Sequence, residues 1–282
     1  MKVLFLILNY KTYQETIQLA EKLYEEGLND KYILIVDNAS PNDSFNEISK
    51  KVGRLKNVEV ISSSENGGFA KGNNFGLRYA KRYQPEYVCI INNDVMFSMV
   101  TIDNLCKWYE TLPNVAFIAP RQIIPNGNEA LFRNLDVPTL WTDISLYNPF
   151  NRKYHHYVEN TEIKGVNEIG IIPGAFIFTK FSIFESLGFF DEDTFLFCEE
   201  RFIAKKAQMK RLKNYIILNE TYLHAHSTTI KNEASEKRQR KMILDGRCMY
   251  HWKYSSVPAL SVGILKAAYL LKEFCFYFKK NR

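Results

Sequence analysis

The sequence predicts an α/β fold in which a mainly parallel mixed sheet is flanked by helices. Short apolar runs typical of buried parallel strands alternate with amphipathic helical stretches. Polar residues directly follow several of these runs. The 282 residues, 46% of them apolar and 24% charged, suffice for one large globular domain. This composition excludes collagen-like, disordered and disulfide-scaffold proteins.

The N-terminal part of the chain shows the alternation most clearly. Buried strands are expected at residues 2–10, 32–38, 58–64 and 87–91. Between the first two strands lies a helical stripe that ends near Gly27, where a C-cap glycine belongs. A short helix is expected before the third strand, and another is expected to begin near Asn73. This order predicts strand–helix–strand units with parallel strands.

The remainder of the chain is less regular. Residues 121–170 are expected to form loops with a short hairpin. Further elements are expected at 171–193 (strand, helix and turn), 195–210 (helix) and 215–226 (strand). Apolar residues recur at helical spacing over residues 257–278. We therefore expect a main domain over residues 1–230 and a C-terminal helical extension over residues 231–282.

The chain has a net charge of +6, and its basic residues concentrate near the C-terminus, in residues 231–241 and in the last four residues. Such a balance suits nucleic acid, anionic lipid or phosphorylated small molecules as partners. No basic motif interleaved with aromatic residues resembles a nucleic-acid-binding module, so no nucleic-acid partner is expected.

The cysteines and the N-terminal residues indicate a compartment. The five cysteines are scattered and form no CxxC pair, which indicates a reducing environment and argues against a cysteine-rich zinc site. The N-terminal residues show no cleavable signal pattern, and no uninterrupted apolar stretch of about 18 residues predicts a transmembrane helix. We therefore expect a cytoplasmic protein.

Polar residues terminate three of the predicted strands. They are Asn9, then Asp37 and Asn38, and finally Asn92, Asn93 and Asp94. Ligands of open α/β sheets bind outside the carboxyl ends of the strands, so this pattern predicts a nucleotide-type ligand. Asp94 could hold a hard divalent cation that binds a diphosphate, and Asp37 could bind a base or ribose. Capping of a helix by Asp94 and an Asx turn at Asp37 are the structural alternatives.

Three further groups are candidates for chemistry. The glycine-rich segment 65–76 would let the backbone approach an anion, although a plain turn before a helix also explains it. Glu199 and Glu200 could include a general base, or could complement the dipole of a helix that begins there. His224 and His226 share one face of a strand and could contact a metal or a diphosphate, or could be structural.

Eight segments together resemble bacterial family 2 glycosyltransferases with the GT-A fold, a Rossmann-like α/β architecture, especially rhamnosyltransferase-like members. In order, the segments are ILNY, IVDNAS, ENGGFAKGNN, INNDV, PGAFIF, GFFDED, FCEE and HAHSTT. The resemblance covers roughly residues 3–230, and it keeps the order and spacing of the blocks. It implies that Asp37 contacts the nucleobase. It also implies that the nucleotide pocket is lined by Asn9, Asn66, Gly68 and Lys71.

The same resemblance implies a metal centre and a base. Asp94 matches the last aspartate of the DxD motif and would hold Mg²⁺ or Mn²⁺ against the diphosphate. His224 matches a late histidine of the family and would complete the metal and phosphate contacts. Glu200 falls on the second position of the family's "ED" motif, where the catalytic base is expected, and Glu199 lies beside it.

The resemblance also implies donor contacts, and the sequence departs from the family at two positions. Gly174 and Ala175 would form the floor of the sugar site, and Asn92 and Asn93 would complete the donor-binding set. Asn92 stands where the first DxD aspartate is usual, which removes one charged contact with the cation. Glu200 replaces the usual aspartate, which keeps the carboxylate on a longer side chain.

The expected activity is an inverting transfer of a sugar from a nucleotide diphosphate, a UDP- or dTDP-sugar, to an acceptor hydroxyl. The expected setting is cell-surface polysaccharide or glycan synthesis. Three alternatives stay open. A non-catalytic nucleotide-sugar or glycan-binding protein would not need Glu200, and a nucleotidyltransferase would usually carry a glycine-rich basic loop after the first strand. A nicotinamide oxidoreductase would need glycines in the segment NYKTYQET, which has none.

The C-terminal stripe suggests a location for the protein. Leu260, Ile264, Ala267, Leu271 and Phe274 recur at helical spacing, and several lysines lie nearby. That pattern suits a helix lying on the inner face of the cytoplasmic membrane, where a lipid-linked or other glycan acceptor would be presented. A helix packed on the main domain, or a homodimer contact, would give the same pattern.

Overall fold

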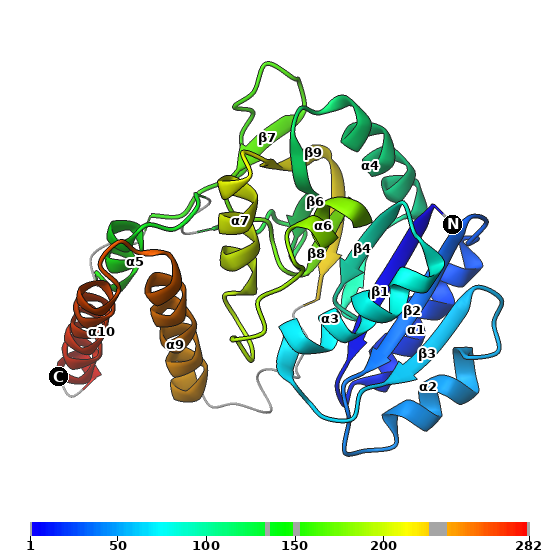
Figure 1. Ribbon diagram of the computed structural model, residues 1–282, viewed down its shortest axis with the longest axis horizontal. Helices are drawn as coiled ribbons and strands as arrows, with labels where there is room; N and C mark the ends of the chain where they lie inside the picture. The colour runs from blue at the N-terminus through cyan, green and yellow to red at the C-terminus, as the bar shows by residue number, and fades with distance from the viewer. Residues whose placement is uncertain (1, 133–135, 149–152, 226–235, 281–282) are drawn as a thin grey trace.

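The computed structural model describes residues 2–132, 136–148, 153–225 and 236–280, the last five of these by their backbone alone. An α/β body built around one sheet makes up most of the molecule, and two long helices stand beside it at one end (Figure 1). The α/β class predicted from the sequence is confirmed.

The sheet of the described residues contains nine strands in the order β3-β2-β1-β4-β8-β6-β9-β5, with β7 paired to β9. The strands are β1 Val3–Asn9, β2 Lys31–Asp37, β3 Val58–Ser62, β4 Tyr87–Ile91, β5 Val95–Met96, β6 Val115–Ile123, β7 Val166–Ile169, β8 Phe176–Lys180 and β9 Lys213–His224. Strands β3, β2, β1 and β4 are parallel, as predicted. Beyond β4 the sheet is mixed, because β8 runs antiparallel to both β4 and β6, while β6 and β9 are parallel.

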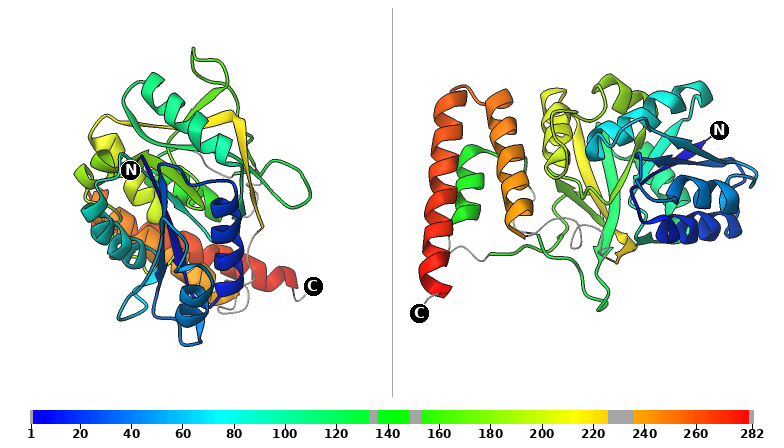
Figure 2. Two further views of the ribbon diagram at one scale, coloured as in Figure 1. Left: turned by 90° about the vertical axis from the view of Figure 1, so that its right-hand side faces the viewer. Right: turned by 90° about the horizontal axis from the view of Figure 1, so that it is seen from below.

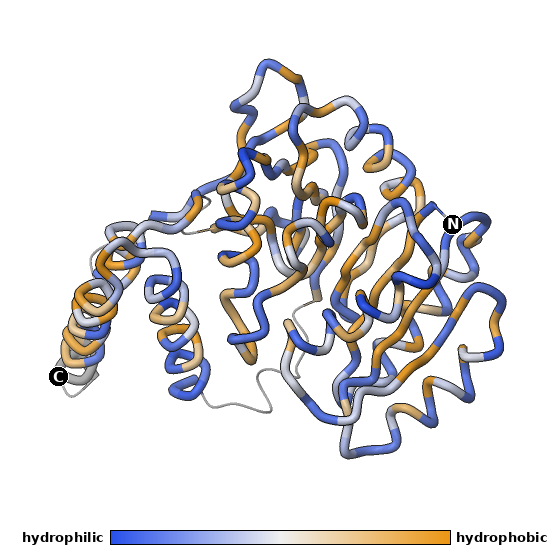
Figure 3. The backbone as a smooth tube through the Cα atoms, in the orientation of Figure 1, coloured by the Kyte–Doolittle hydropathy of each residue, from blue (hydrophilic) through white to orange (hydrophobic). Residues whose placement is uncertain are grey.

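The helices of the described ranges cover both faces of this sheet, except for three that form a separate unit beside it (Figure 1). In chain order, the helices are α1 Tyr13–Glu25, α2 Ser44–Val52, α3 Gly68–Ala80, the 3₁₀ turn η1 Lys81–Tyr83, α4 Met99–Thr111, α5 Leu140–Tyr147, α6 Phe181–Ser186, α7 Glu199–Met209, α9 Glu236–Tyr254 and α10 Pro258–Lys280. Helices α1 and α3 lie on opposite faces of the parallel half (Figure 2). The strands between them are mostly hydrophobic (Figure 3), as expected when both faces of a parallel sheet are covered.

Two glycines explain how closely α3 packs on the sheet. A Cβ atom at Gly72 would lie 2.7 Å from Leu8 Cδ1, and one at Gly76 would lie 2.5 Å from Leu6 Cδ1. Both positions are buried, and they are spaced by four residues on one face of the helix. Gly72 and Gly76 therefore allow α3 to pack closely against β1. The helix begins at Gly68, five residues before the predicted start near Asn73.

The region 121–170 differs from the expectation of loops with a hairpin, because it contains helix α5. Thr139 and Thr142 form a capping box at its start, and Leu140 and Ile144 pack against the C-terminal helices. The helix is stabilised by these long-range contacts, which a local pattern does not reveal. The strand at 215–226 is confirmed as far as His224, and His226 lies outside the described residues.

Helices α9 and α10 pack on α5 to form a small helical unit with its own core. Tyr147, Leu244, Cys248 and Leu265 are buried in this core. The unit therefore includes one helix from inside the range 1–230. Among the residues described, no helix is long and apolar enough to cross a membrane.

A buried charged cluster ties the helical unit to the main domain. Asp143 of α5 is fully buried and accepts hydrogen bonds from Arg201 Nη1 at 2.7 and 2.8 Å. His251 Nε2 of α9 lies 2.8 Å from the same carboxylate. Arg201 belongs to α7, so the cluster fixes α5 and α9 beside the first turn of α7.

Candidate active site

A network of polar side chains joins the carboxyl ends of β1 and β2. Asn9 and Asp37 are register partners at these strand ends, and Asn9 Nδ2 donates to Asp37 Oδ1 at 2.7 Å. Ser40 donates to Asp37 through its backbone N–H at 3.0 Å and its hydroxyl at 2.7 Å. Asp37 is thus held in one orientation at the edge of the sheet, although it is only 2% exposed.

The network extends to Asn93 through a residue that the sequence analysis missed. Thr16 of α1 donates through its hydroxyl to Asn9 Oδ1 at 2.8 Å. Asn93 Nδ2 donates to the Thr16 hydroxyl at 2.9 Å and to the Thr12 hydroxyl at 2.7 Å. Asn9 and Asn93 therefore hold neighbouring side chains in place through hydrogen bonds. The signal in the sequence was that Thr16 lies three and four residues before Leu19 and Ala20, on the apolar stripe of α1.

The glycine-rich segment is positioned by a second set of bonds. Asn38 Nδ2 donates to Asn66 Oδ1 at 2.9 Å, and the same oxygen accepts from the Gly68 N–H at 3.0 Å. Gly68 has φ +83°, and a Cβ atom there would lie 2.0 Å from the Phe195 carbonyl oxygen. The glycine is thus required by the approach of residue 195, a structural reason that needs no ligand.

Lys71 extends from this segment to solvent. Its ammonium pairs with the carboxylate of Glu65, and this hydrogen bond raises the pKa of Lys71. In this conformation the Lys71 charge is directed to the surface pair and not to Asp37, so the structure does not bring it into the polar network.

Asp94 and His224 lie side by side although 130 residues separate them. Strand β5 pairs with the end of β9, so that Val95 is the register partner of His224, and the Ala225 N–H donates to the Asp94 carbonyl at 3.0 Å. His224 Nε2 is 3.3 Å from Asp94 Oδ1. The two side chains are 14% and 6% exposed, respectively, so the pair is largely withdrawn from water.

Gln122 and Tyr222, which the sequence analysis did not single out, orient His224. The Tyr222 hydroxyl donates to Gln122 Oε1 at 3.0 Å, and Gln122 Nε2 lies 3.2 Å from His224 Nδ1. With the amide in this orientation, Nδ1 of the neutral imidazole accepts the hydrogen bond and Nε2 carries the proton toward Asp94. A half-turn of the amide would reverse the tautomer and free Nε2 as a metal ligand.

The pair of Asp94 and His224 fits a divalent cation. A nearly buried carboxylate beside an imidazole nitrogen offers two protein ligands, and their remaining partners would come from a ligand's oxygens or water. Within the ranges that the structure describes, no group of three or more His, Cys, Asp and Glu side chains could hold a metal. Asp94 and His224 would therefore supply only part of a cation's coordination shell.

Glu200 lies at the beginning of α7, near the floor predicted for the sugar site. A Cβ atom at Gly174 would be 3.8 Å from Glu200 Oε2. The next residue, Ala175, accepts a hydrogen bond from the Asn92 N–H at 3.1 Å through its carbonyl. Gly174, which the Glu200 carboxylate faces, is thus followed directly by the residue that is hydrogen-bonded to the start of the Asn92–Asp94 segment. Glu200 is half-buried, and burial raises the pKa of its carboxyl.

Glu199 has a different environment from its neighbour. Its side chain is nearly fully buried, and Oε1 has no hydrogen-bond partner. Burial, followed by the charge of Glu200, raises the pKa of Glu199 to about 8. Burial thus favours the neutral form of Glu199, and Glu200, which is the more exposed of the two and faces Gly174, is the carboxylate placed to act as a base.

The turn before α7 sets the direction of both carboxylates. Phe197 and Cys198 both have φ +73°, a left-handed conformation that is costly for residues other than glycine. Phe197 packs with Phe202 and Tyr250, which helps to hold this turn in place. Strained backbone of this kind is concentrated at functional sites.

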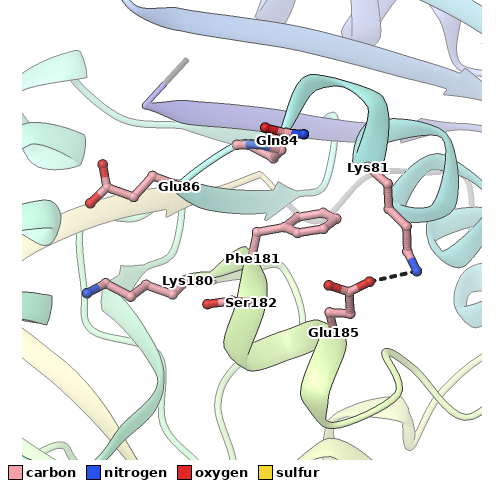
Figure 4. Close-up of a pocket in the computed structure, with 8 residues that line it drawn as sticks. Lys81, Gln84, Glu86, Lys180, Phe181, Ser182 and Glu185 are labelled. Carbon is pink, nitrogen blue, oxygen red and sulfur yellow. Dashed lines mark ion pairs between the residues drawn. The ribbon is translucent and has the colours of Figure 1, made fainter.

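A separate cavity of about 510 Å³ lies away from these residues (Figure 4). It adjoins Glu86, which precedes β4, and so it lies at the amino end of that strand. Its wall includes the ion pair between Lys81 and Glu185, at 2.7 Å. None of the residues predicted for the site lines this cavity.

The family model described as Glycosyl transferase family 2 matches residues 6–188. Low-salt glycan biosynthesis hexosyltransferase Agl10 of Haloferax volcanii is 24% identical to the chain over 208 residues. The matched region is 73% of this chain and 62% of that protein, so the chain spans less than two thirds of this relative's length.

Two solved structures share the architecture. One is GalNAc-T7 with UDP, GalNAc and Mn²⁺, with a TM-score of 0.64 at 11% identity over 80% of this chain and 44% of that chain. The other is residues 1–349 of S. aureus TarS with UDP-GlcNAc, with a TM-score of 0.59 at 14% identity over 98% of this chain and 73% of that chain. At these identities the likeness establishes the fold.

Proposed function

The chain belongs to glycosyltransferase family 2 and has the GT-A fold, and we propose that it transfers a sugar from a nucleotide-diphosphate donor to an acceptor hydroxyl with inversion. One observation carries this proposal. The carboxylate of Glu200 faces Gly174, and the strand ends beside it bear Asp94 with His224 and the oriented Asp37.

Glu200 acts as the general base. Its carboxylate takes the proton from the acceptor hydroxyl while the oxygen attacks the anomeric carbon of the donor sugar. The new glycosidic C–O bond forms on the face opposite the diphosphate. The bond from the anomeric carbon to the diphosphate oxygen breaks, and its electron pair leaves with the nucleoside diphosphate. A single displacement of this kind inverts the anomeric configuration.

Asp94 and His224 would hold Mg²⁺ or Mn²⁺ at the diphosphate. A cation bound there would neutralise the charge that develops on the leaving diphosphate. Asn92 cannot add a second charge at the position where the family usually has an aspartate. The protein's own contribution is therefore the single carboxylate of Asp94, which is kept beside His224 by the pairing of β5 with β9.

The donor side of the site follows from the network around Asp37. Asp37 binds the base of a UDP- or dTDP-sugar, while Asn9 fixes its orientation. The segment with Asn66, Gly68 and Lys71 covers the nucleotide, and Lys71 leaves its surface pair with Glu65 to meet the phosphates. The UDP and UDP-GlcNAc named for the two solved structures support a nucleotide-sugar donor.

The biological setting is glycan or cell-surface polysaccharide synthesis on the cytoplasmic side of the membrane, with a glycan or lipid-linked acceptor. The relative named for glycan biosynthesis supports this setting, and the sequence blocks support a rhamnosyltransferase-like donor preference. In this proposal residues 1–230 form the glycosyltransferase domain. Residues 231–282 form an extension that places the enzyme at the membrane's inner face.

The test is the release of nucleoside diphosphate from UDP-, dTDP- and GDP-sugars in the presence of Mn²⁺. Wild-type protein is expected to turn over at least one donor, slowly with water and faster with a suitable acceptor. Glu200→Gln should lower the rate by about 10²–10⁴-fold, which is the usual contribution of a general base. Glu185→Gln makes the same change in the distant cavity and should keep the wild-type rate. A Glu200→Gln rate within about tenfold of wild type would remove Glu200 as the base.

A further inference from the structure

The helical unit contains a second cavity, of about 650 Å³, between α9 and α10. Four cationic side chains line it, Lys237, Arg238, Lys241 and Lys266, and Asp245 is the carboxylate among its lining residues. Lys241 Nζ lies 2.7 Å from Asp245 Oδ2, so this pair compensates one charge. Three positive charges remain in excess around the cavity, which favours an anionic ligand such as a phosphate group.

The outer face of α10 adjoins this cavity and is apolar. Leu260, Ile264, Leu271 and Phe274 are all exposed large hydrophobic residues, with Leu271 at 67% and Phe274 at 62%. They recur at helical spacing, so they form one stripe along the helix. Leu270 is 65% exposed, lines the cavity and borders the stripe, which makes the apolar face and the cationic cavity one continuous surface.

Pairing with a second copy of the chain is the competing explanation for this stripe. The spacing of four and three residues between Leu260, Ile264, Ala267, Leu271 and Phe274 would suit the seam of a coiled coil. The flanking positions of such a seam usually carry charges that specify the partner. Here none of the flanking positions, Ser261, Gly263, Ala268, Leu270 and Cys275, carries a charge, and the exposed Leu270 widens the apolar face, which suits acyl chains better than a partner helix.

The charge of the whole extension also matches an anionic surface. Residues 231–282 carry twelve basic and four acidic residues, whereas the preceding 230 residues carry 25 basic and 27 acidic residues. The positive excess of the chain therefore lies entirely in the extension. Anionic lipid headgroups attract segments that carry several Lys and Arg residues near the membrane surface.

We propose that α10 lies along an anionic membrane with its apolar stripe among the acyl chains, and that the α9–α10 cavity binds the phosphate group of a lipid. This inference rests on the proposed function, because it gives the enzyme access to an acceptor in the membrane. The link to the site is rigid, since His251 of α9 and Arg201, next to Glu200, share the buried carboxylate of Asp143.

Vesicle flotation of the full-length chain tests the proposal. Wild-type protein should float with vesicles of phosphatidylcholine and phosphatidylglycerol in equal parts, and far less with phosphatidylcholine alone. Leu260→Glu/Leu271→Glu removes the apolar stripe, and Lys241→Glu/Lys266→Glu reverses the charge of the cavity. Each should weaken partitioning on the order of tenfold or more. Lys50→Glu/Lys51→Glu makes the same charge change on α2 and should float like wild type.

Control measurements distinguish membrane binding from misfolding, from a soluble anion site and from dimer formation. Thermal unfolding and donor turnover, measured for each variant, should stay at the wild-type level, because the surface lies outside the donor site. At constant ionic strength, inorganic phosphate should not displace wild-type protein from anionic vesicles, because free phosphate cannot replace the contacts of the apolar stripe with the acyl chains. Stabilisation by phosphate without flotation would assign the cavity to a soluble anion and overturn the proposal. The proposal would also be overturned if the wild type does not float and light scattering shows a dimer that Leu260→Glu/Leu271→Glu dissociates. Flotation without donor turnover would leave the membrane surface standing and refute the proposed function alone.

Discussion

At the scale of single residues, the two neighbouring carboxylates at the start of α7 have different chemistry because they have different surroundings. Glu199 points into the interior, where Oε1 has no partner, and burial favours its neutral form. Glu200 faces Gly174, where the cationic groups of Arg201 and Arg247 partly offset the effect of burial on its pKa. Because adjacent residues point in different directions from a helix, only Glu200 of the two is placed to accept a proton.

The pH dependence of turnover should report this arrangement. Burial raises the pKa of Glu200, and a base acts in its deprotonated form. The value of kcat/KM should therefore fall with decreasing pH, with a midpoint above the ordinary glutamate pKa of about 4.3. Glu199→Gln should keep this acid limb, because burial favours the neutral form of Glu199. A pH–rate profile that stays level down to the ordinary carboxylate range would contradict the assignment.

Sequence reasoning found the residues at strand ends but not those that orient them. Asp37 and Asp94 follow apolar runs, and the carboxyl ends of parallel strands define where a ligand binds. Thr16 and Gln122 act through contacts with side chains far away in the chain, and no local pattern marks such contacts. Gly68 was singled out for a ligand, whereas its geometry is explained by the carbonyl of Phe195.

At the scale of elements, the site depends on the crossing between the glycine-rich segment and the loop before α7. The Phe69 N–H donates to the Phe195 carbonyl at 2.8 Å, and Gly68 leaves room for that contact. Asn38 and Asn66 hold the segment from the other side. The donor-side segment and the loop that leads into α7 and Glu200 are therefore fixed to each other.

Comparing Gly68→Ala with Gly27→Ala should show how much unfolding free energy is lost through a steric clash at this crossing, beyond the cost of the left-handed backbone conformation. Gly27 also has a positive φ, +92°, but a Cβ atom there meets nothing within 4 Å. Gly27→Ala should therefore cost only the left-handed penalty of about 1–2 kcal/mol in unfolding free energy. Gly68→Ala should cost clearly more, because the new methyl group overlaps the Phe195 carbonyl. Denaturant unfolding of both variants measures the difference, and equal losses would mean that the crossing is not tightly packed.

The elements of the parallel half were predictable, because strands covered on both faces give long apolar runs and their helices give amphipathic stripes. Helix α5 was not, although its capping box is local. Its apolar residues, Leu140 and Ile144, are partly buried because α9 and α10 return from the end of the chain. The mixed half of the sheet likewise depends on pairing between strands distant in sequence.

At the scale of the whole molecule, Asp143 is the point where the helical unit and the glycosyltransferase body meet. Burial alone would raise the pKa of Asp143, but the hydrogen bond with His251 and the charges of Arg201 and Arg247 outweigh it and lower the pKa. The ionised carboxylate therefore stabilises the folded state at neutral pH. This stabilisation is lost as the pH falls through the lowered pKa.

Asp143→Ala should strongly destabilise the protein, because it leaves Arg201 and His251 buried without their shared partner. Breaking a buried ion pair in this way costs about 3–5 kcal/mol, which corresponds to a drop in Tm of at least ~6 °C in a chain of this size. Glu236→Ala removes an exposed pair with Arg240 and should change Tm by no more than ~2 °C. Equal shifts in Tm would show that the cluster does not hold the unit in place.

We propose that Asp94 and His224 bind a divalent cation together with a nucleoside diphosphate. A thermal-shift panel of UDP, dTDP and GDP, each with and without Mn²⁺, tests it most directly in wild type and Asp94→Asn. At about 100 times its Kd, the cognate diphosphate should stabilise the wild type by about 2.7 kcal/mol, or roughly 5–10 °C in Tm. This stabilisation should require Mn²⁺ and should be largely absent in Asp94→Asn. If no diphosphate raises Tm, or if Asp94→Asn responds to Mn²⁺ and diphosphate as the wild type does, Asp94 and His224 do not form the proposed metal–diphosphate site.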